Sequence, residues 1–297
     1  MKKQYFIFAL SLLCLISCQP DNPQPNTSNN GSDSGYTIDS TSTGNSGSGS
    51  TTDTTSTGNS GSGSTTDTTS TGNSGGGTYP QGTVHCLVTP TAVVDVTNPT
   101  TGKTWMDRNL GASQAAASSV DLSSYGDLYQ WGRGADGHQC RNSSTRSYLS
   151  FSDQPGHGDF IIFLSGNWHS DWRSSPNDNL WQGVNGINNP CPSGYRLPTS
   201  AELDAERASW ISKNVSGAFA SPLRFIPAGS RSGDNANASL NSVGTTGNYW
   251  SSTVYGSNIS YLYIPNDGLL GYNNEIIYAS IRYSIRLSGL SVRCLKD

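Results

Sequence analysis

The pattern of apolar and polar positions divides the chain into three regions. Lys2 and Lys3 precede an apolar run from Phe6 to Ile16. A long polar region follows, and from about residue 83 onward short apolar segments alternate with turn-forming residues. A helix that spans a bilayer needs about 20 apolar residues, so this shorter run after two lysines predicts a signal peptide.

In the third region the apolar spacing predicts two helices and several short strands. One helix is expected over 123–131 and a longer one from Thr199 to about Lys213, where Thr199 and Glu202 have the spacing of a capping box. Strands are expected at 93–96, 104–107, 223–227, 249–254, 260–264 and 291–296. Two helices among short strands and long loops predict an α+β domain over residues 83–297, large enough for a core.

Residues 19–82 carry almost no side chains that a core could bury. A 14-residue segment that begins at Thr41 recurs from Thr55, and a third copy begins at Thr69. Stacked repeats need apolar residues, and these copies have none, so the region is predicted to be a disordered tether. With about 60 residues its mean reach would be on the order of 45 Å, enough to lift a domain off a membrane.

The signal peptide, residues 1–18, ends in Leu15, Ile16, Ser17 and Cys18. This ending resembles a lipobox, in which the cysteine at the cleavage point is lipidated; the alternative is an ordinary signal peptide with an incidental cysteine. Each buried methylene of an acyl chain contributes about 0.8 kcal/mol, so the several chains of a lipoprotein cysteine would hold the protein firmly. We expect an outer-membrane lipoprotein, anchored through Cys18, that faces the cell exterior, with a periplasmic orientation as the alternative.

Charge narrows the range of partners. The chain has 17 basic and 21 acidic residues, and loss of the signal peptide removes two lysines and no acidic residue. An acidic mature chain argues against nucleic acid and against an anionic membrane surface as partners. Charged residues make up only 13% of the chain, which suits an extracellular protein rich in strands and loops.

Four cysteines lie outside the signal peptide: Cys86, Cys140, Cys191 and Cys294. Export places them in an oxidising compartment, and their even number predicts two disulfide bonds. The sequence alone leaves three pairings open.

Five segments of the third region form an ordered set of motifs: 104–112 (TWMDRNLGA), 125–133 (YGDLYQWGR), 189–199 (NPCPSGYRLPT), 249–253 (YWSST) and 291–297 (SVRCLKD). They resemble the Fibrobacter succinogenes major paralogous domain, found in lipoproteins of Bacteroidetes and Fibrobacteres, and they cover most of residues 93–297. The resemblance implies a C-type-lectin-like fold related to the sulfatase-modifying-factor type. The molecular function of the family is poorly defined, so the resemblance informs the fold more than the activity.

In such a fold the N- and C-terminal strands meet, and long loops between the last strands form the binding face. The resemblance further implies that Cys191 pairs with Cys294, which leaves Cys86 for Cys140. A disulfide that closes a loop of about 100 residues is worth up to about 4.7 kcal/mol on the chain-entropy estimate.

Within the tether, an aspartate precedes and a threonine follows each of Ser40, Thr54 and Thr68. This pattern resembles the acceptor sequence of the O-glycosylation system of Bacteroidetes, although so short a pattern also arises by chance in a Thr-rich tract. Glycans at these positions would stiffen the tether and shield it from proteases.

No group of residues has the spacing of a catalytic site. The four histidines show no metal-ligand spacing, and neither a nucleophile elbow nor a phosphate loop is present. Asp171 and Glu202 form a carboxylate pair that glycoside hydrolysis could use, but Glu202 is assigned to the helix cap and Asp171 to a polar loop. We therefore expect a protein without enzymatic activity.

No cofactor is expected either, with calcium as the alternative. Residues 175–178 and 264–267 resemble the Pro-Asn loops with which C-type lectins bind calcium. Both lack the acidic or amide residue before proline, and carboxylates are too sparse to build a site of roughly six to eight oxygens.

Tyr and Asn are dense between residues 255 and 286, where the resemblance places binding loops. The candidate ligand-binding residues are Tyr261, Tyr263, Asn266, Asp267, Tyr272, Asn273, Asn274, Tyr278 and Tyr283. Tyr provides rigid amphipathic contact and Asn adaptable hydrogen bonding, which together favour a recognition surface.

Two alternatives apply to these candidates. Tyr261 and Tyr263 would pack inward if their strand alternates toward a core, whereas Gly271 favours exposure of residues 272–274. The crowding of Asn, Tyr, Ser and Ile over 272–288 is also typical of gene segments that retroelements diversify in related lectin-like proteins.

The favoured function is recognition at the cell surface: a lipid-anchored domain binds an extracellular glycan or protein through its C-terminal loops, without catalysis. The first alternative is a structural role as a fimbria-associated or surface-assembly component, and a more distant one is an enzyme that acts on polysaccharide. A structural partner should leave a large apolar patch. A ligand binder should show a polar groove studded with aromatic residues, and an enzyme should show convergent carboxylates or histidines.

Overall fold

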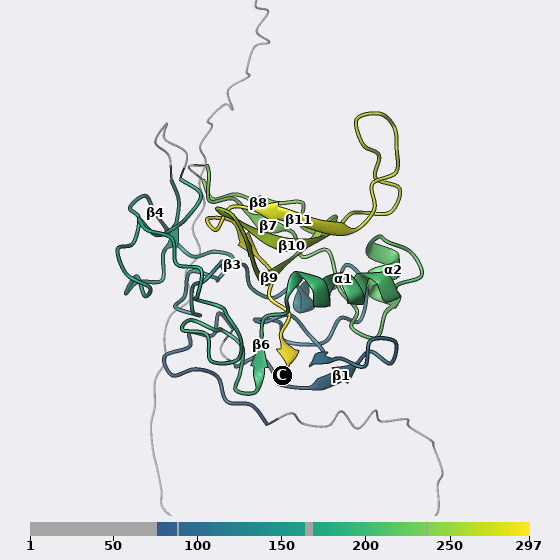
Figure 1. Ribbon diagram of the computed structural model, residues 1–297, viewed down its shortest axis with the longest axis horizontal. Helices are drawn as coiled ribbons and strands as arrows, with labels where there is room; N and C mark the ends of the chain where they lie inside the picture. The colour runs from purple at the N-terminus through teal and green to yellow at the C-terminus, as the bar shows by residue number, and fades with distance from the viewer. Residues whose placement is uncertain (1–75, 88, 164–168, 236) are drawn as a thin grey trace, which may run out of the picture. The chain divides into compact units, whose positions relative to one another are not determined.

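The computed structural model describes residues 76–87, 89–163, 169–235 and 237–297. Cys18, Ser40, Thr54 and Thr68 lie outside the described residues. The described part is an α+β structure with two α-helices and several small, mostly antiparallel sheets (Figure 1). The helices are α1 (Ser200–Ser209) and α2 (Val215–Ala220), and neither is long and apolar enough to cross a membrane.

Helix α1 begins with the predicted capping box. The Glu202 amide donates to Thr199 Oγ1 (3.2 Å), and the Glu202 carboxylate accepts from the Thr199 amide (2.8 Å). The helix ends before Trp210, earlier than predicted, because the Trp210 backbone is extended and its indole N–H donates back to Glu206 at 3.0 Å. Burial of the indole therefore ends the helix one turn early.

The helix predicted over 123–131 is wrong. The segment holds one 3-10 turn, η1 (Leu122–Ser124), followed by strand β3 (Tyr129–Gln130). Between them Gly126 has φ +67°, and a Cβ at this position would lie 2.3 Å from the Leu110 carbonyl oxygen. The chain turns here in a conformation that suits glycine and that a helix does not contain.

The described strands form four small sheets. One has the order β1 (Asp95–Thr97), β2 (Thr104–Met106), β13 (Leu295–Lys296), β6 (Tyr195–Arg196). A second has the order β11 (Ser280–Ser284), β10 (Asn258–Ile264), β9 (Gly247–Tyr255), and a third β3, β12 (Gly289–Leu290), β7 (Ser230–Arg231), β8 (Leu240–Asn241). Strands β4 (Thr145–Arg146) and β5 (Phe160–Ile161) form a parallel pair. Because β13 lies between β2 and β6, the first and last strands of the domain share one sheet.

Most predicted strands are present. Strands β1, β2, β9 and β10 match four predicted segments, and the segment 291–296 is reduced to β13. The strand predicted over 223–227 is wrong, because Arg224 has φ +47°, which interrupts extended backbone. Leu223 and Phe225 on either side of it are nevertheless fully buried. Their apolar character reflects burial in a loop rather than a strand.

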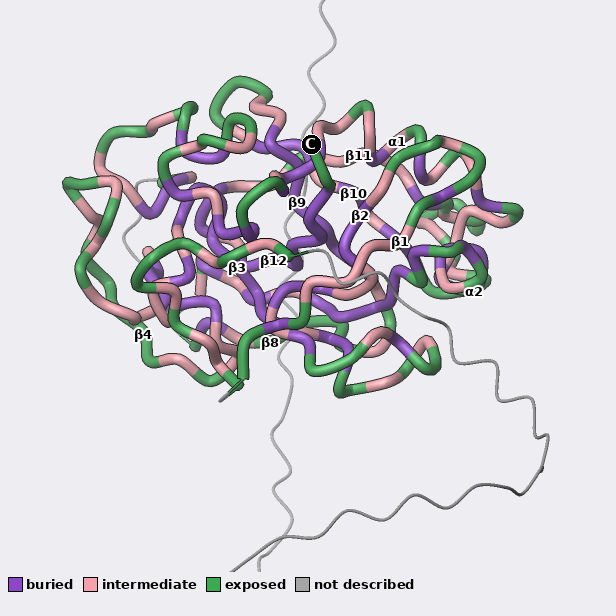
Figure 2. The backbone as a smooth tube through the Cα atoms, turned by 90° about the horizontal axis from the view of Figure 1, so that it is seen from below, coloured by how far each residue is buried: buried purple, intermediate pink, exposed green. Residues whose placement is uncertain are grey.

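The core lies on both faces of β9 and β10, and Figure 2 shows buried backbone along these strands. On one face, Leu203 of α1 belongs to a cluster with Trp105, Trp210, Phe225, Tyr249, Leu262 and Leu295. On the other lie Tyr129, Trp131, Trp181, Trp250, Ile259 and Val292. Full burial of one large apolar side chain contributes about 1.5–3 kcal/mol, so these two clusters hold the sheet rigidly.

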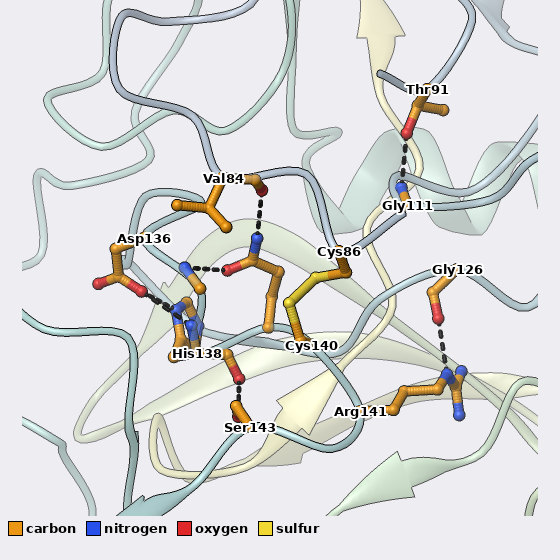
Figure 3. The surroundings of a disulfide bond; sticks show 12 residues. Val84, Cys86, Thr91, Gly111, Gly126, Asp136, His138, Cys140, Arg141 and Ser143 are labelled. Carbon is orange, nitrogen blue, oxygen red and sulfur yellow. Dashed lines mark hydrogen bonds and ion pairs between the residues drawn. A yellow bond between two sulfur atoms is a disulfide. The ribbon is translucent and has the colours of Figure 1, made fainter. Parts of the chain in front are cut away.

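Two disulfide bonds join distant parts of the described chain. Cys86 bonds to Cys140 and Cys191 to Cys294, which confirms the pairing that the resemblance implied. Figure 3 shows the first bond, which fastens the segment that enters the domain to the loop after β3. The second joins the segment before α1 to the residue that precedes the last strand, across a separation of 103 residues.

Candidate ligand-binding surfaces

Residues 265–279, between β10 and β11, form a projecting loop that we call the finger (Figure 1, upper right). Its two arms form an antiparallel bridge between Leu270 and Ile276. The Gly271 amide donates to the Glu275 carbonyl and the Ile277 amide to the Leu269 carbonyl, both at 2.8 Å. The finger is therefore a short hairpin with its own backbone hydrogen bonds.

The finger exposes tyrosine and aliphatic side chains together. Tyr272 at the tip is fully exposed, and Leu270, Ile276 and Tyr278 are 53%, 50% and 59% exposed. Asn274 has φ +60°, a left-handed conformation that Asn tolerates better than most residues. The sequence thus predicted the exposure at the tip but gave no weight to the two aliphatic residues.

The base of the finger is fixed to α2. The Asp267 carboxylate accepts from the Ser216 amide (3.1 Å) and from the Ser216 hydroxyl. The Ala279 amide donates to the Lys213 carbonyl at 2.7 Å. Asp267 therefore positions the finger, while its neighbour Asn266 is exposed.

Tyr261 and Tyr263 lie on β10, on the face opposite α1, and both are half-buried. The Tyr261 ring meets the buried Trp250 ring edge-on at 6.1 Å between centroids, and burial raises the pKa of Tyr261. Tyr263 lies beneath the Arg282 guanidinium, 3.6 Å from its ring centroid. Tyr261 thus packs against the core, as the second interpretation of the sequence allowed.

Tyr283 on β11 belongs to an aromatic pair that the sequence did not indicate. Its ring stacks on that of Tyr255, at the end of β9, with centroids 4.3 Å apart and an interplanar angle of 24°. Both rings are more than half exposed. Tyr255 was missed because it lies one residue beyond the predicted strand 249–254, and only the antiparallel pairing through β10 brings it to Tyr283.

A second concave surface was not predicted at all. A cavity of about 750 Å³, which we call the cleft, lies between four segments: 78–84, 134–136, 153–157 and 184–193. The first of these, which we call the strap, leads to Cys86 and the first disulfide. No sequence pattern marks the cleft, because its walls meet only after the disulfides and long-range backbone contacts have formed.

The two surfaces lie far apart. The strap and the C-terminus are neighbours, since the Thr78 amide donates to Ser193 Oγ (3.0 Å) and the Asp297 amide to the Gly194 carbonyl (3.0 Å). In Figure 1 the C-terminus is at the bottom and the finger at the upper right. The strap therefore enters the domain at the end remote from the finger.

The carboxylates considered for chemistry are engaged in ion pairs. The Arg196 guanidinium donates to Glu202 at 2.9 Å, and despite partial burial its hydrogen bonds and those of Thr199 lower the pKa of Glu202 to about 2. Asp171 is buried 3.5 Å from Arg286, and Asp178 in the first Pro-Asn loop also pairs with Arg286. Among the described residues, no three His, Cys, Asp or Glu side chains are grouped as metal ligands.

Comparison of the chain with family models, with curated proteins and with solved structures found no match.

Proposed function

We propose that the chain is a surface-displayed lipoprotein whose domain, of the C-type-lectin-like type, binds an extracellular ligand through the finger without catalysis. The finger carries this proposal: it is a projecting hairpin with Tyr272 fully exposed at its tip, on a base fixed to a rigid core. Tyr and Asn in this arrangement suit recognition, because tyrosine gives a large contact area at low entropic cost.

Several observations support the lectin-like assignment. The first and last strands of the domain share a sheet through β2 and β13, and the longest hairpin connection joins the late strands β10 and β11. Cys191 and Cys294 are bonded as the resemblance implied. These features agree with the motif resemblance and concern the fold type rather than the ligand.

The exposed aliphatic residues of the finger suit the apolar centre of a protein interface. Leu270 and Ile276 offer no hydrogen bonds, and they lie on the same hairpin as Tyr278. Protein interfaces combine aromatic anchors with an apolar centre and are poor in charge. Glu275 and Asp267 are the acidic residues of the finger, and Asp267 is engaged at its base. A permanent assembly partner would use the same apolar contacts, so a structural role is the second candidate.

The test is binding of the full chain, produced in an oxidising compartment, to panels of extracellular proteins and glycans with and without calcium. The variant Tyr272→Ala/Asn273→Ala/Asn274→Ala should lose its protein ligand by at least tenfold, since contact residues at an interface centre contribute about 1–2 kcal/mol each or more. Tyr148→Ala, an exposed tyrosine remote in sequence from the finger, is the matched control and should bind normally.

Each alternative has its own outcome in that experiment. A ligand that binds the finger variant as tightly as the wild type contradicts recognition by the finger tip. A chelator that abolishes binding would restore the calcium alternative. Absence of any ligand from a folded, oxidised protein would favour the structural role.

A further inference from the structure

Hydrogen bonds within the domain hold the walls of the cleft in place. The Val84 amide donates to the Ala135 carbonyl (2.7 Å), and the Gln139 side chain donates to the Val84 carbonyl (2.8 Å) beside the first disulfide (Figure 3). At the other end of the strap the Ser193 amide donates to the Thr78 carbonyl at 2.8 Å. A preformed site binds without the entropic cost of ordering its walls.

Gly77, the residue before the strap, lies so close to the opposite wall that a side chain there would have to displace it. A Cβ at this position would lie 2.7 Å from the Ser193 carbonyl oxygen and 3.1 Å from Pro192. Both wall segments are also close to disulfides, since Cys191 lines the cleft and Cys86 follows the strap. The cleft is thus shaped by the fold of the described chain around both disulfides.

The cleft offers no unpaired charge to a ligand. Its two acidic lining residues are Asp136 and Asp153. Asp136 accepts from the buried Arg133 at 2.7 Å and from the His138 ring at 2.6 Å, and Asp153 pairs with Arg173. The described lining contains neither lysine nor arginine. A phosphate, sulfate or uronate would find no cation here, and a basic peptide would find the carboxylates already paired.

What the lining does offer is uncharged hydrogen-bonding groups. The side-chain amides of Gln81, Gln154 and Asn185 line the cleft and make no side-chain hydrogen bond with any described residue. His157 Nδ1 accepts from the Asp159 amide at 3.1 Å, which leaves Nε2–H as a donor, and burial lowers the pKa of His157 although the Asp159 carboxylate opposes the shift. Amides and an imidazole N–H pair well with sugar hydroxyls, which both donate and accept.

The apolar parts of the lining fit the same ligand. Val84 and Ile187 expose about half of their side chains where they line the cleft. Pyranose rings have C–H faces that pack on such surfaces while their hydroxyls reach the amides. The volume of about 750 Å³ lies in the range of small-ligand sites.

We infer that the cleft is a second binding site, which takes a neutral oligosaccharide at the end of the domain remote from the finger. Hydrogen bonds come from Gln81, Gln154, Asn185 and His157, and apolar contact comes from Val84 and Ile187. This site is independent of the proposed function of the finger, because no residue is shared between the two surfaces.

The test is binding of the full chain to an array of neutral hexose and N-acetylhexosamine oligosaccharides, beside sulfated and uronate-containing ones of equal length. We expect neutral members to bind. Gln154→Ala/Asn185→Ala should lower their affinity by about tenfold or more, since each lost hydrogen bond costs about fivefold. Ile187→Trp, at an exposed position that tolerates a larger side chain, should block the cleft and abolish binding.

The finger variant Tyr272→Ala/Asn273→Ala/Asn274→Ala is the matched control and should keep its sugar affinity. Sugar binding that this variant loses, or that Ile187→Trp leaves intact, would place the sugar elsewhere and overturn the inference. Preference for the sulfated or uronate-containing oligosaccharides, or binding to no member of the array, would also overturn it. None of these results bears on protein binding by the finger, so the two proposals fail separately.

Discussion

The finger and the cleft are built by opposite means. The finger is one continuous segment, 265–279, which is held by its own hairpin hydrogen bonds and by a short base. The walls of the cleft come from four segments that two disulfides and several backbone contacts bring together. A continuous hairpin can change its side chains with little effect on the fold, whereas the cleft exists only when the whole domain is folded. The comparison therefore predicts that changes around the cleft lower the stability of the domain. Changes in the finger should mainly weaken ligand binding.

The largest effect on stability is expected when the second disulfide is removed. Cys191→Ala/Cys294→Ala opens a loop of about 100 residues and should reduce the free energy of unfolding by about 4 kcal/mol. Urea unfolding of the full chain measures this. Replacement of residues 270–276 by a two-residue Asn-Gly turn should cost less than about 1 kcal/mol, because these residues are largely exposed and outside the core. Equal losses in the two variants would contradict the comparison.

The difference between a continuous segment and walls that meet from distant segments also explains how much the sequence could predict. The capping box at Thr199 and Glu202 defined the start of α1, and Gly271 predicted an exposed finger tip, because both signals are local. The helix over 123–131 failed because Gly126 turns against Leu110, a contact that no local pattern records.

The cleft could not be predicted for the same physical reason. Its strap and the wall at 184–193 are about 100 residues apart in the chain, and they meet through Thr78 and Ser193. Neither residue has a composition or spacing that marks a site. The residues alone left three disulfide pairings open, and the motif resemblance supplied the pairing that the structure shows.

The second prediction concerns a buried carboxyl beneath the strap. Asp127 lies beside Gly111, and burial raises its pKa to about 7, although Arg141 opposes the rise. Because the folded pKa is higher than the ordinary value of 3.8, the folded state binds the proton more tightly than the unfolded state. The stability that Asp127 contributes is complete below about pH 3.8 and is lost as the pH rises through 7, by up to about 4 kcal/mol. Asp127→Asn should remove this loss.

A second buried group, His138, makes a contribution to stability that changes with pH in the opposite direction. Burial, aided by the charge of Arg133, lowers the pKa of His138 to about 4, so this ring destabilises the fold as the pH falls from 6.5 toward 4. The wild-type curve alone would mix both groups. The informative quantity is the difference in unfolding free energy between wild type and Asp127→Asn, followed from pH 4.5 to 7.5. A difference that does not change with pH would show that Asp127 titrates as an exposed carboxyl.

The smallest expected effect on stability comes from a change in the finger. The same change distinguishes a protein ligand from a glycan. Leu270→Ser/Ile276→Ser replaces the aliphatic pair across the hairpin and should cost less than about 1 kcal/mol, the size of one cross-strand contact. A protein ligand should nevertheless bind at least tenfold more weakly, because both side chains would be buried at its interface. Val120→Ser/Leu122→Ser, two exposed apolar residues outside both surfaces, is the matched control. A finger ligand that tolerates loss of Leu270 and Ile276 but not of Tyr272 would have to bind through aromatic stacking and hydrogen bonds alone. That result would favour a glycan at the finger and would remove the main chemical difference between the two surfaces.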